Sequence, residues 1–189
     1  MLVSRATYHH GDLRAVILTE AARLIAERGA ERLSLRELAR EAGVSHAAPA
    51  HHFTDRRGLL TALAAEGFTM LADVLEAARP EFLDAALAYV RFALAHPGHF
   101  AVMFDASLLD GADPALLAAQ LAASAELSRG VASLTDSKAK ANPKEAELAA
   151  WSMVHGFSML WLNNAFTPDV TQTDPMELVE RMGRILFDG

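Results

Sequence analysis

The segment 34–60 constrains the fold most narrowly, because its residues mark two short helices joined by a tight turn. Ser34 and Glu37 have the spacing of a capping box, in which each side chain satisfies a backbone N–H at the start of a helix. Leucine and alanine then recur at helical spacing, and Gly43 supplies the left-handed residue that ends many helices. Ser45 predicts the start of a second helix two residues later. This pattern is typical of a helix-turn-helix, whose second helix fits the major groove of DNA.

The same segment resembles the DNA-binding region of the TetR family of bacterial regulators. The positions that carry the resemblance are Ala42, Gly43, Val44, Ser45, His52, Phe53 and Arg56. It implies a recognition helix that closes on His-Phe and a basic residue that opens a long fourth helix. The chain departs from the family at Pro49 and at Ala50, where most members carry an aromatic residue, usually tyrosine, that contacts the DNA backbone. A proline in the first turn is compatible with a helix, because the N–H that it lacks is mostly unpaired there.

Helix-turn-helix geometry and this resemblance together predict which residues approach DNA. Expected to face the groove are His46, Ala47, Ala48 and His51, and expected nearer the phosphates are Ser34, Arg36, Ser45, His52 and Arg56. Small side chains and histidines read few base edges, so specificity should depend on DNA deformation and on the arm before the first helix. In that arm, Arg5, Tyr8 and His9 resemble the lead-in of one TetR subgroup, and a frayed terminus is the alternative.

Charge is divided unevenly along the chain. The formal net charge is −7, but residues 1–60 hold nine arginines and seven acidic residues, a net of +2. Arg56 and Arg57 lie in the first turn of a helix that Asp55 can cap, where the macrodipole disfavours cations. Cations at that position indicate a nearby anion such as a phosphate, and two solvated arginines are the alternative. A mixed, solvated surface is likewise the alternative to a DNA-binding face.

The rest of the chain has the pattern of successive helices. Helices are expected from His10 or Asp12 to Gly29 and over 55–78, 80–96, 97–109, 114–135, 143–166 and 175–187, with a solvent-exposed polar loop at 136–142. Asp113, Asn142 and Asp174 each pair an N-cap residue with proline at the first helical position. No alternating run rich in β-branched residues is present, so the sequence predicts an all-α protein. Its two parts are a three-helix DNA-binding domain over 1–54 and a helical effector-binding and dimerisation domain over 55–189.

Other classes of protein are disfavoured by what the sequence lacks. It contains no cysteine, which excludes disulfides and thiolate metal sites. The first residues lack the apolar core of a signal peptide, and no run approaches the roughly 20 apolar residues of a membrane span. The G-x-S-x-G, P-loop and H-E-x-x-H motifs are absent. We therefore expect a cytoplasmic protein that is not an enzyme and has no metal, cofactor or membrane partner.

The second half resembles the C-terminal domain of a TetR subgroup that is named for a Trp…His-Gly motif. The segments 96–104 and 151–160 carry this resemblance, with Trp151, His155 and Gly156 as the motif. Trp151 and His155 are four residues apart and thus lie on one face of a helix, and Gly156 lets another helix approach closely. A buried, hydrogen-bonded core histidine is the alternative interpretation of His155.

Aromatic and sulfur-containing side chains concentrate between residues 80 and 166, together with a few histidines. This combination predicts an effector pocket, because ligand sites are mostly apolar with a few convergent polar groups. The residues expected to line it are Phe92, His96, His99, Phe100, Met103, Phe104, Trp151, His155 and Met159. The expected ligand is small, largely apolar and bonded through one oxygen by a histidine. A purely structural core would have the same composition.

The predicted function is that of a homodimeric transcriptional regulator, by family resemblance a repressor. A small-molecule effector would release it from a pseudo-palindromic operator in double-stranded DNA. The dimer is expected through the helices over 143–166 and 175–187, and an intramolecular core stripe is the alternative for the last one. The interface residues expected there are Leu178, Met182, Ile185 and Leu186. A function of another class stays open: an all-helical ligand-binding or interaction protein without specific DNA binding.

Overall fold

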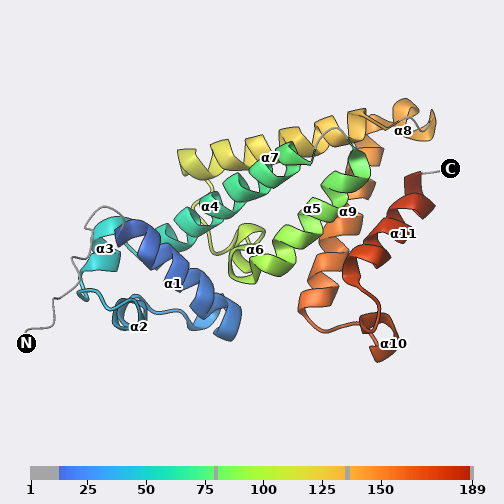
Figure 1. The fold of residues 1–189 in the computed structure, drawn as a ribbon. Coiled ribbons are helices and arrows are strands. Elements are labelled where there is room, and N and C mark those ends of the chain that lie inside the picture. Colours follow the sequence, from blue (N-terminus) through green and yellow to red (C-terminus); the bar gives the residue numbers. More distant parts are fainter. Residues whose placement is uncertain (1–12, 79–80, 135–136, 188–189) are drawn as a thin grey trace, which may run out of the picture.

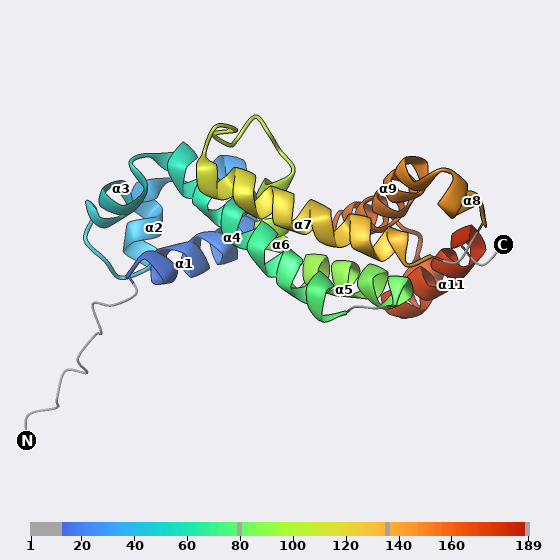
Figure 2. The ribbon, with the colours of Figure 1, turned by 90° about the horizontal axis from the view of Figure 1, so that it is seen from above.

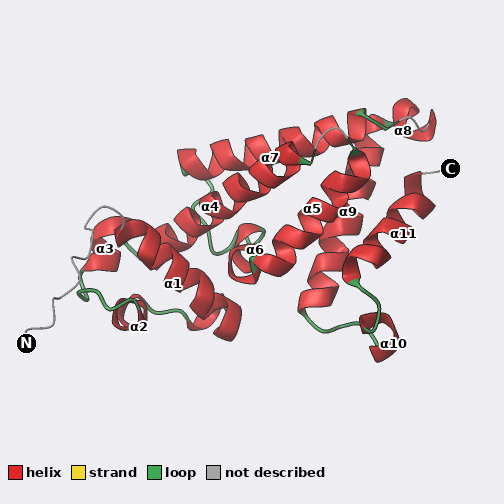
Figure 3. Cartoon of the chain, in the orientation of Figure 1, coloured by secondary structure: helices red, strands yellow, loops and turns green. Residues whose placement is uncertain are grey.

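The structure, a computed structural model, describes residues 13–78, 81–134 and 137–187. Throughout these residues the chain forms helices joined by loops, and no strand occurs among them (Figure 3). The predicted all-α fold class is therefore confirmed. In chain order the helices are α1 (Leu13–Arg28), the short 3-10 helix η1 (Ala30–Arg32), α2 (Leu35–Glu41), α3 (Ala48–Phe53), α4 (Arg56–Ala77), α5 (Phe82–Ala95), α6 (Pro97–Met103), α7 (Pro114–Ala132), α8 (Ser137–Ala141), α9 (Pro143–Leu162), α10 (Pro168–Thr171) and α11 (Pro175–Phe187).

Side-chain caps account for the starts of α2, α4, α7 and α11. The Ser34 hydroxyl oxygen accepts the N–H of Glu37 at 3.2 Å, and Asp55 Oδ1 accepts that of Gly58 at 2.8 Å. Asp113 Oδ1 accepts the N–H of Leu116 at 2.8 Å, and Asp174 Oδ1 accepts that of Met176 at 2.7 Å. Each bond satisfies an N–H that the first helical turn leaves unpaired. Asn142 occupies the N-cap position of α9 as predicted, but its side chain makes no capping hydrogen bond.

Several boundaries differ from the prediction. The segment 97–109 is helical to Met103 and then forms a loop, in which Asp105 Oδ1 accepts the backbone N–H of Ser107 at 3.0 Å in a local turn that competes with helix. Helix α9 ends before 166 because Asn164 adopts a left-handed φ of 52°. The expected exposed loop at 136–142 instead contains α8, whose Ala139 is buried in a small apolar cluster. Helix α10 lies where the sequence predicts none.

Helices α1, α2 and α3 form a compact head at one end of the molecule (Figure 1). Ile17 and Leu18 of α1, Leu38 of α2 and Phe53 of α3 are buried together in its core. Val44, in the turn between α2 and α3, is partly buried against the same core. The side chains that close this core are therefore those that set the angle between the two helix-turn-helix elements.

Helix α4 leaves the head and runs beside α7 through the second part of the molecule, the body (Figures 1 and 2). This helix is long and apolar enough to cross a membrane by length and composition alone, although the sequence predicted no such segment. Most of its apolar stretch is buried inside the protein, as is normal for the central helix of a folded core. Helices α5, α6 and α7 pack around it.

Helix α6 touches both α1 and α4, and glycine makes each contact possible. A Cβ atom at Gly98 would lie 2.0 Å from the carbonyl oxygen of Ala22 in α1, and one at Gly67 in α4 would lie 2.7 Å from Met103 Sδ. Real Cβ atoms do not approach other atoms so closely, so α6 can sit at this distance from α1 and α4 because these positions carry no side chain.

The loop that follows α6 is bonded to the first turns of α4. Arg57 Nε donates to the carbonyl oxygen of Leu109 at 2.9 Å. The backbone N–H of Asp110 donates to Thr61 Oγ1 at 2.9 Å, and that hydroxyl in turn donates to the carbonyl oxygen of Arg57 at 2.8 Å. Together these bonds fix the loop to the end of α4 that enters the head. We refer to them as the α4–loop clasp.

Helix α11 packs against α5 at the end of the body away from the head (Figure 2). Leu178 and Met182, two of the residues expected at a dimer interface, are partly buried against the chain's own core. This placement matches the intramolecular alternative for these two. Ile185 and Leu186 are 81% and 52% exposed, so a second copy can reach them.

Replacing Gly98 with alanine tests the contact between α6 and α1. The added Cβ would overlap the backbone of Ala22, so we expect the variant Gly98→Ala to lose about 1–3 kcal/mol of unfolding free energy in urea titrations. The matched control is Gly111→Ala, since among the described residues only its chain neighbours could lie within 4 Å of a Cβ at that position. Equal stabilities of the two variants would contradict the close approach.

Candidate nucleic-acid interface and ligand cavity

Most residues expected at DNA are exposed on the α2–α3 side of the head. The exposed ones are Ser34, Arg36, Ser45, His46, Ala47, His51 and His52. Ala48 is 8% exposed and belongs to the head core, so its expected position facing the groove is wrong. The periodicity of a six-residue helix could not separate it from its neighbours. Ala50 is exposed in its place.

Helix α3 begins at Ala48 and not near Ser45 as predicted. The cause is Pro49, which has no N–H to donate to the carbonyl oxygen four residues earlier, that of Ser45. That oxygen instead accepts the N–H of Ala48 at 3.0 Å in a tighter turn, and the N–H of His51 bonds to Ala47 at 2.9 Å. The recognition helix is consequently short, and His46 and Ala47 lie in the turn that precedes it.

The two arginines that open α4 have protein partners. Arg56 donates through Nε to the carbonyl oxygen of Leu33 at 3.0 Å and through a terminal nitrogen to that of Ala30 at 2.6 Å. Arg57 belongs to the α4–loop clasp through the carbonyl oxygen of Leu109. Carbonyl oxygens therefore balance these cations at the helix start, and their presence there does not by itself indicate a phosphate.

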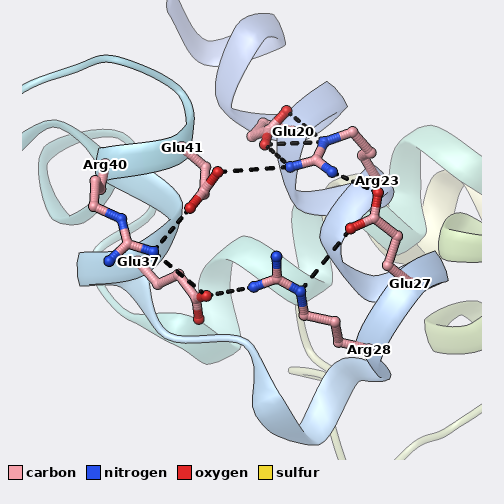
Figure 4. A network of polar contacts seen from close by, with 7 residues as sticks. All are labelled: Glu20, Arg23, Glu27, Arg28, Glu37, Arg40 and Glu41. Atoms are coloured by element: carbon pink, nitrogen blue, oxygen red, sulfur yellow. Dashed lines mark hydrogen bonds and ion pairs between the residues drawn. The ribbon is translucent and has the colours of Figure 1, made fainter.

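An ion-pair network covers the outer surface of α1 and α2 (Figure 4). Its members are Glu20, Arg23, Glu27, Arg28, Glu37, Arg40 and Glu41. Arg23 lies 2.5 Å from both Glu20 and Glu27, and their hydrogen bonds raise its pKa. Arg28 of α1 lies 2.5 Å from Glu37 of α2 and so joins the two helices. On an exposed surface such pairs add little stability, but they neutralise three of the head's arginines.

Few cations of the described head remain free. Arg14 lies over the ring of Phe53, 5.2 Å from its centroid. Among the arginines in residues 13–60, Arg32 and Arg36 are exposed and make no hydrogen bond or ion pair within the described part of the chain. Arg36 is in the first turn of α2, beside the helix-turn-helix surface. It is thus the described arginine best placed for a DNA phosphate. Arg5, Tyr8 and His9 of the expected arm lie outside the described residues.

The body contains a cavity of about 490 Å³ between α4, α5, α7, α9 and the loop after α6. This volume is within the range of small-molecule sites. Its lining residues are Phe68, Leu71, Leu75, Tyr89, Met103, Phe104, Ala106, Leu109, Gln120, Ala123, Ser124, Leu127, Lys144, Glu147, Leu148 and Trp151. Most are apolar, and the few polar ones come from α5, α7 and α9.

Of the residues expected to line an effector pocket, Met103, Phe104 and Trp151 do so. Those that do not line this cavity are Phe92, His96, His99, Phe100, His155 and Met159. Phe92 and Phe100 are buried in the core, and Met159 is exposed on the outer side of α9. The sequence prediction included none of the residues of α4 and α7 that line the cavity. Their residues recur at helical spacing, but spacing cannot distinguish a wall of a cavity from a face of a filled core.

Tyr89 connects the cavity to the predicted Trp…His-Gly motif. Its hydroxyl lies 3.0 Å from His155 Nδ1, and the indole of Trp151 also hydrogen-bonds it. Because an indole N–H can only donate, the tyrosine oxygen accepts from Trp151 and its proton is available to the imidazole. Burial lowers the pKa of His155, so the ring is neutral and can accept that proton in a hydrogen bond. Burial also raises the pKa of Tyr89, which keeps it protonated.

The other two histidines lie at the α6 end of the body. His99 is buried, and its Nε2 is 3.0 Å from Glu66 Oε2 in α4. His96 is near His99, with ring centroids 5.8 Å apart, and its pKa is lowered first by burial and then by the charge of His99. No group of three or more metal-ligating side chains is found among the described residues. His99 joins α6 to α4, and neither histidine lines the ligand cavity.

A helix-turn-helix head, joined by one long helix to a helical body with a partly open cavity, defines the class of DNA-binding transcriptional regulators. The chain belongs to the TetR family. The family description "Tetracyclin repressor-like, C-terminal domain" matches residues 82–186, more than half of the chain, and "Bacterial regulatory proteins, tetR family" matches residues 17–63. The predicted family is thereby confirmed. Proteins of this family are regulators and not enzymes, as the sequence led us to expect.

Solved structures share the fold of this chain. The chain is 36% identical to a protein of unknown function from Rhodococcus sp. RHA1, with a TM-score of 0.75 and 98% of each chain covered. PfmR, a TetR family regulator from Thermus thermophilus, is 22% identical, with a TM-score of 0.68 over 92% of this chain and 97% of that one. AibR, in complex with isovaleryl coenzyme A and operator DNA, is 21% identical, with a TM-score of 0.68 over 93% and 97%. Among curated proteins no match was found.

Arginine substitutions in the head should separate phosphate contact from structural support. Arg36→Ala should weaken binding to unrelated duplexes alike and reduce the salt slope by up to about one unit, because one counterion-releasing contact is lost. Arg56→Ala should lower the unfolding free energy by about 1–3 kcal/mol, because two carbonyl oxygens lose a charged donor. Arg181→Ala, in the remote helix α11, is the control. A larger salt-slope change in Arg56→Ala than in Arg36→Ala would reverse the assignment.

The neutral state of His155 predicts a pH dependence of stability. Its folded-state pKa is lowered, so below about pH 7 the unfolded chain binds more protons at this ring, and stability falls as the pH drops through the usual histidine pKa of about 6.5. The variant His155→Phe should lose this contribution. The measurement is the difference in unfolding free energy between wild type and variant at pH 7.5 and pH 5.5. A difference that is independent of pH would show that His155 is not held neutral.

Proposed function

We propose that this protein is a homodimeric repressor in the cytoplasm that binds a pseudo-palindromic operator and is released by a small, largely apolar effector. The observation that carries this proposal is the cavity, because its wall includes Leu109, whose carbonyl oxygen is held by Arg57 at the head end of α4. A ligand that displaces this wall would act on the helix that positions the head. Family membership supports DNA binding and regulation.

A second route connects the cavity to the head through α6. Met103, at the end of this helix, lines the cavity, and Gly98, near its start, lies against Ala22 of α1. Movement of Met103 by a ligand would therefore be transmitted to the first helix of the head. To release DNA, the ligand must bind more tightly to the form whose heads do not fit adjacent grooves. A coupling of about 1–3 kcal/mol would change operator affinity roughly 5–150-fold.

The dimer is proposed from the exposed apolar side of α9 and the end of α11. Met159 and Leu160 of α9 are exposed, as are Ile185 and Leu186 of α11. Apart from the backbone of its own helix turn and its chain neighbours, no atom of the described residues lies within 4 Å of a Cβ at Gly156, so its side of α9 is open to a helix from a second copy. Sedimentation at micromolar concentration tests this directly, and a monomer would contradict it. A two-fold dimer would place two heads on half-sites about 34–36 Å apart or more.

We also propose the subgroup of the chain and the boundary between its two domains. The Tyr89 hydrogen bonds to Trp151 and His155 give a physical reason for those two residues and support the Trp…His-Gly subgroup. The division into domains at 54/55 follows the start of α4, although the side chains of that helix belong to both parts.

A second function, ligand binding without specific DNA recognition, is favoured by two observations. The head carries Ala50 at the position of the family's usual aromatic residue and holds most of its described arginines in contacts within the protein. Footprinting of the protein on genomic DNA distinguishes the two functions. Discrete protected sites with two-fold symmetry support the repressor, whereas uniform, weak protection supports the alternative.

Filling the cavity should uncouple the body from the head. Ala123 of α7 is buried and lines the cavity, so Ala123→Phe would place a ring in the ligand space. We expect the variant to protect the same genomic sites as wild type but to stay bound in cells under conditions that release wild type. The neighbour Ala122 is exposed and does not line the cavity, so Ala122→Phe is the matched control. Release of both variants alike would separate the cavity from regulation.

A further inference from the structure

The cavity has an apolar interior. The buried side chains that α4, α6 and the following loop contribute are all apolar: Phe68, Leu71, Leu75, Met103 and Leu109. Phe104 is partly buried and Ala106 is exposed. Tyr89 is the polar side chain among the buried lining residues, and its hydroxyl is already hydrogen-bonded to His155 and Trp151. A ligand group in this interior would therefore meet apolar surface, and a charged or unpaired polar group would lose its hydration without compensation.

The rim of the cavity, formed by α7 and α9, carries its remaining polar residues. Lys144 Nζ lies 3.3 Å from Glu147 Oε1. The Lys144 side chain is 83% exposed and that of Glu147 is 17% exposed. This pair places one positive and one negative charge at the rim, with no net charge. An ion of either sign would meet one like charge and one opposite charge there, so the pair gives little net attraction to a charged ligand.

Two neutral groups at the rim are free. Gln120 and Ser124 are four residues apart on α7 and so lie on one face of that helix. Neither side chain makes a hydrogen bond within the described part of the chain. Each can both donate and accept, so together they can satisfy a hydroxyl, carbonyl or amide oxygen. Histidine, which we expected to bond the ligand oxygen, does not line the cavity.

We propose that the cavity selects an uncharged amphiphile, with an apolar body against α4 and the loop after α6 and one neutral oxygen group hydrogen-bonded to Gln120 and Ser124. This inference rests on the effector role proposed above and adds to it the chemical class of the ligand and the pair of residues that reads it. An uncharged head fits a rim of zero net charge, and an apolar body fits an interior without free polar groups.

The test measures binding directly, without DNA, with probes matched in chain length. The probes are 1-octanol, octanoate and octylamine at pH 7, with toluene as a purely apolar probe. Trp151 lines the cavity and Trp161 does not, so the fluorescence of Trp151 in a Trp161→Phe protein reports occupancy. We expect 1-octanol to bind at least about tenfold more tightly than either ion, because no unpaired charge at the rim offsets the lost hydration of a charged head.

Variants on α7 identify the residues that read the oxygen. Gln120→Leu and Ser124→Ala should each weaken 1-octanol binding about 2- to 10-fold through loss of a neutral hydrogen bond, and should leave toluene binding unchanged. Ser128→Ala is the matched control, because Ser128 is one turn further along α7 and does not line the cavity.

Four results would overturn the proposal. Tighter binding of octanoate that is lost in Lys144→Gln would assign an anionic ligand, and tighter binding of octylamine that is lost in Glu147→Gln would assign a cationic one. Failure of 1-octanol to saturate, or its insensitivity to both α7 variants, would remove the proposed subsite. 1-Octanol could instead bind in the expected order without changing the affinity for a footprinted DNA site. That result would support the proposed ligand class and contradict only the proposed effector role.

Discussion

The burial of α4 is the constraint on which the rest of the structure depends, because this helix contributes to the core of the head and to that of the body. Leu59 and Leu60 near its start and Leu71 further along belong to one continuous apolar cluster that extends from Leu18 of α1 to Val154 of α9. Close-packed interiors do not deform smoothly, so a shift of α4 in the body must change its packing in the head. The two functional regions are thus joined by a shared core and not by a flexible linker.

The head offers fewer free positive charges than its composition suggests. A net charge of +2 in residues 1–60 reads as a weak basic face, but most of the described cations are held by partners within the protein. Arg36 is an exception that lies beside the recognition surface. A head with so few free cations gains little counterion release, so a dimer that doubles the contacts would matter more here than in a strongly basic regulator.

Local sequence rules predicted the elements well, because caps and apolar spacing act over a few residues. The N-caps Ser34, Asp55 and Asp113 and the left-handed Gly43 are examples, and the predicted family followed from the same segment. Long-range partners were not predictable in this way. The carbonyl oxygens that bind Arg56 are more than twenty residues away, and no local pattern points to them. The lining of the cavity was not predictable for the same reason. Phe68 and Phe100 are both apolar, but Phe68 lines the cavity and Phe100 fills the core.

The positions of the polar contacts around the cavity indicate which of its walls a ligand can displace. On the side of α9, the Tyr89 hydroxyl is fixed by two partners, which holds α5 to α9. On the side of the head, the wall at Leu109 is held by the partly exposed guanidinium of Arg57. A hydrogen bond to a charged group contributes about 1.5–3 kcal/mol, less when water can replace it, and this is the size of a typical allosteric coupling. The clasp is therefore strong enough to define the unliganded position of α4 and weak enough for the binding free energy of a small molecule to displace it.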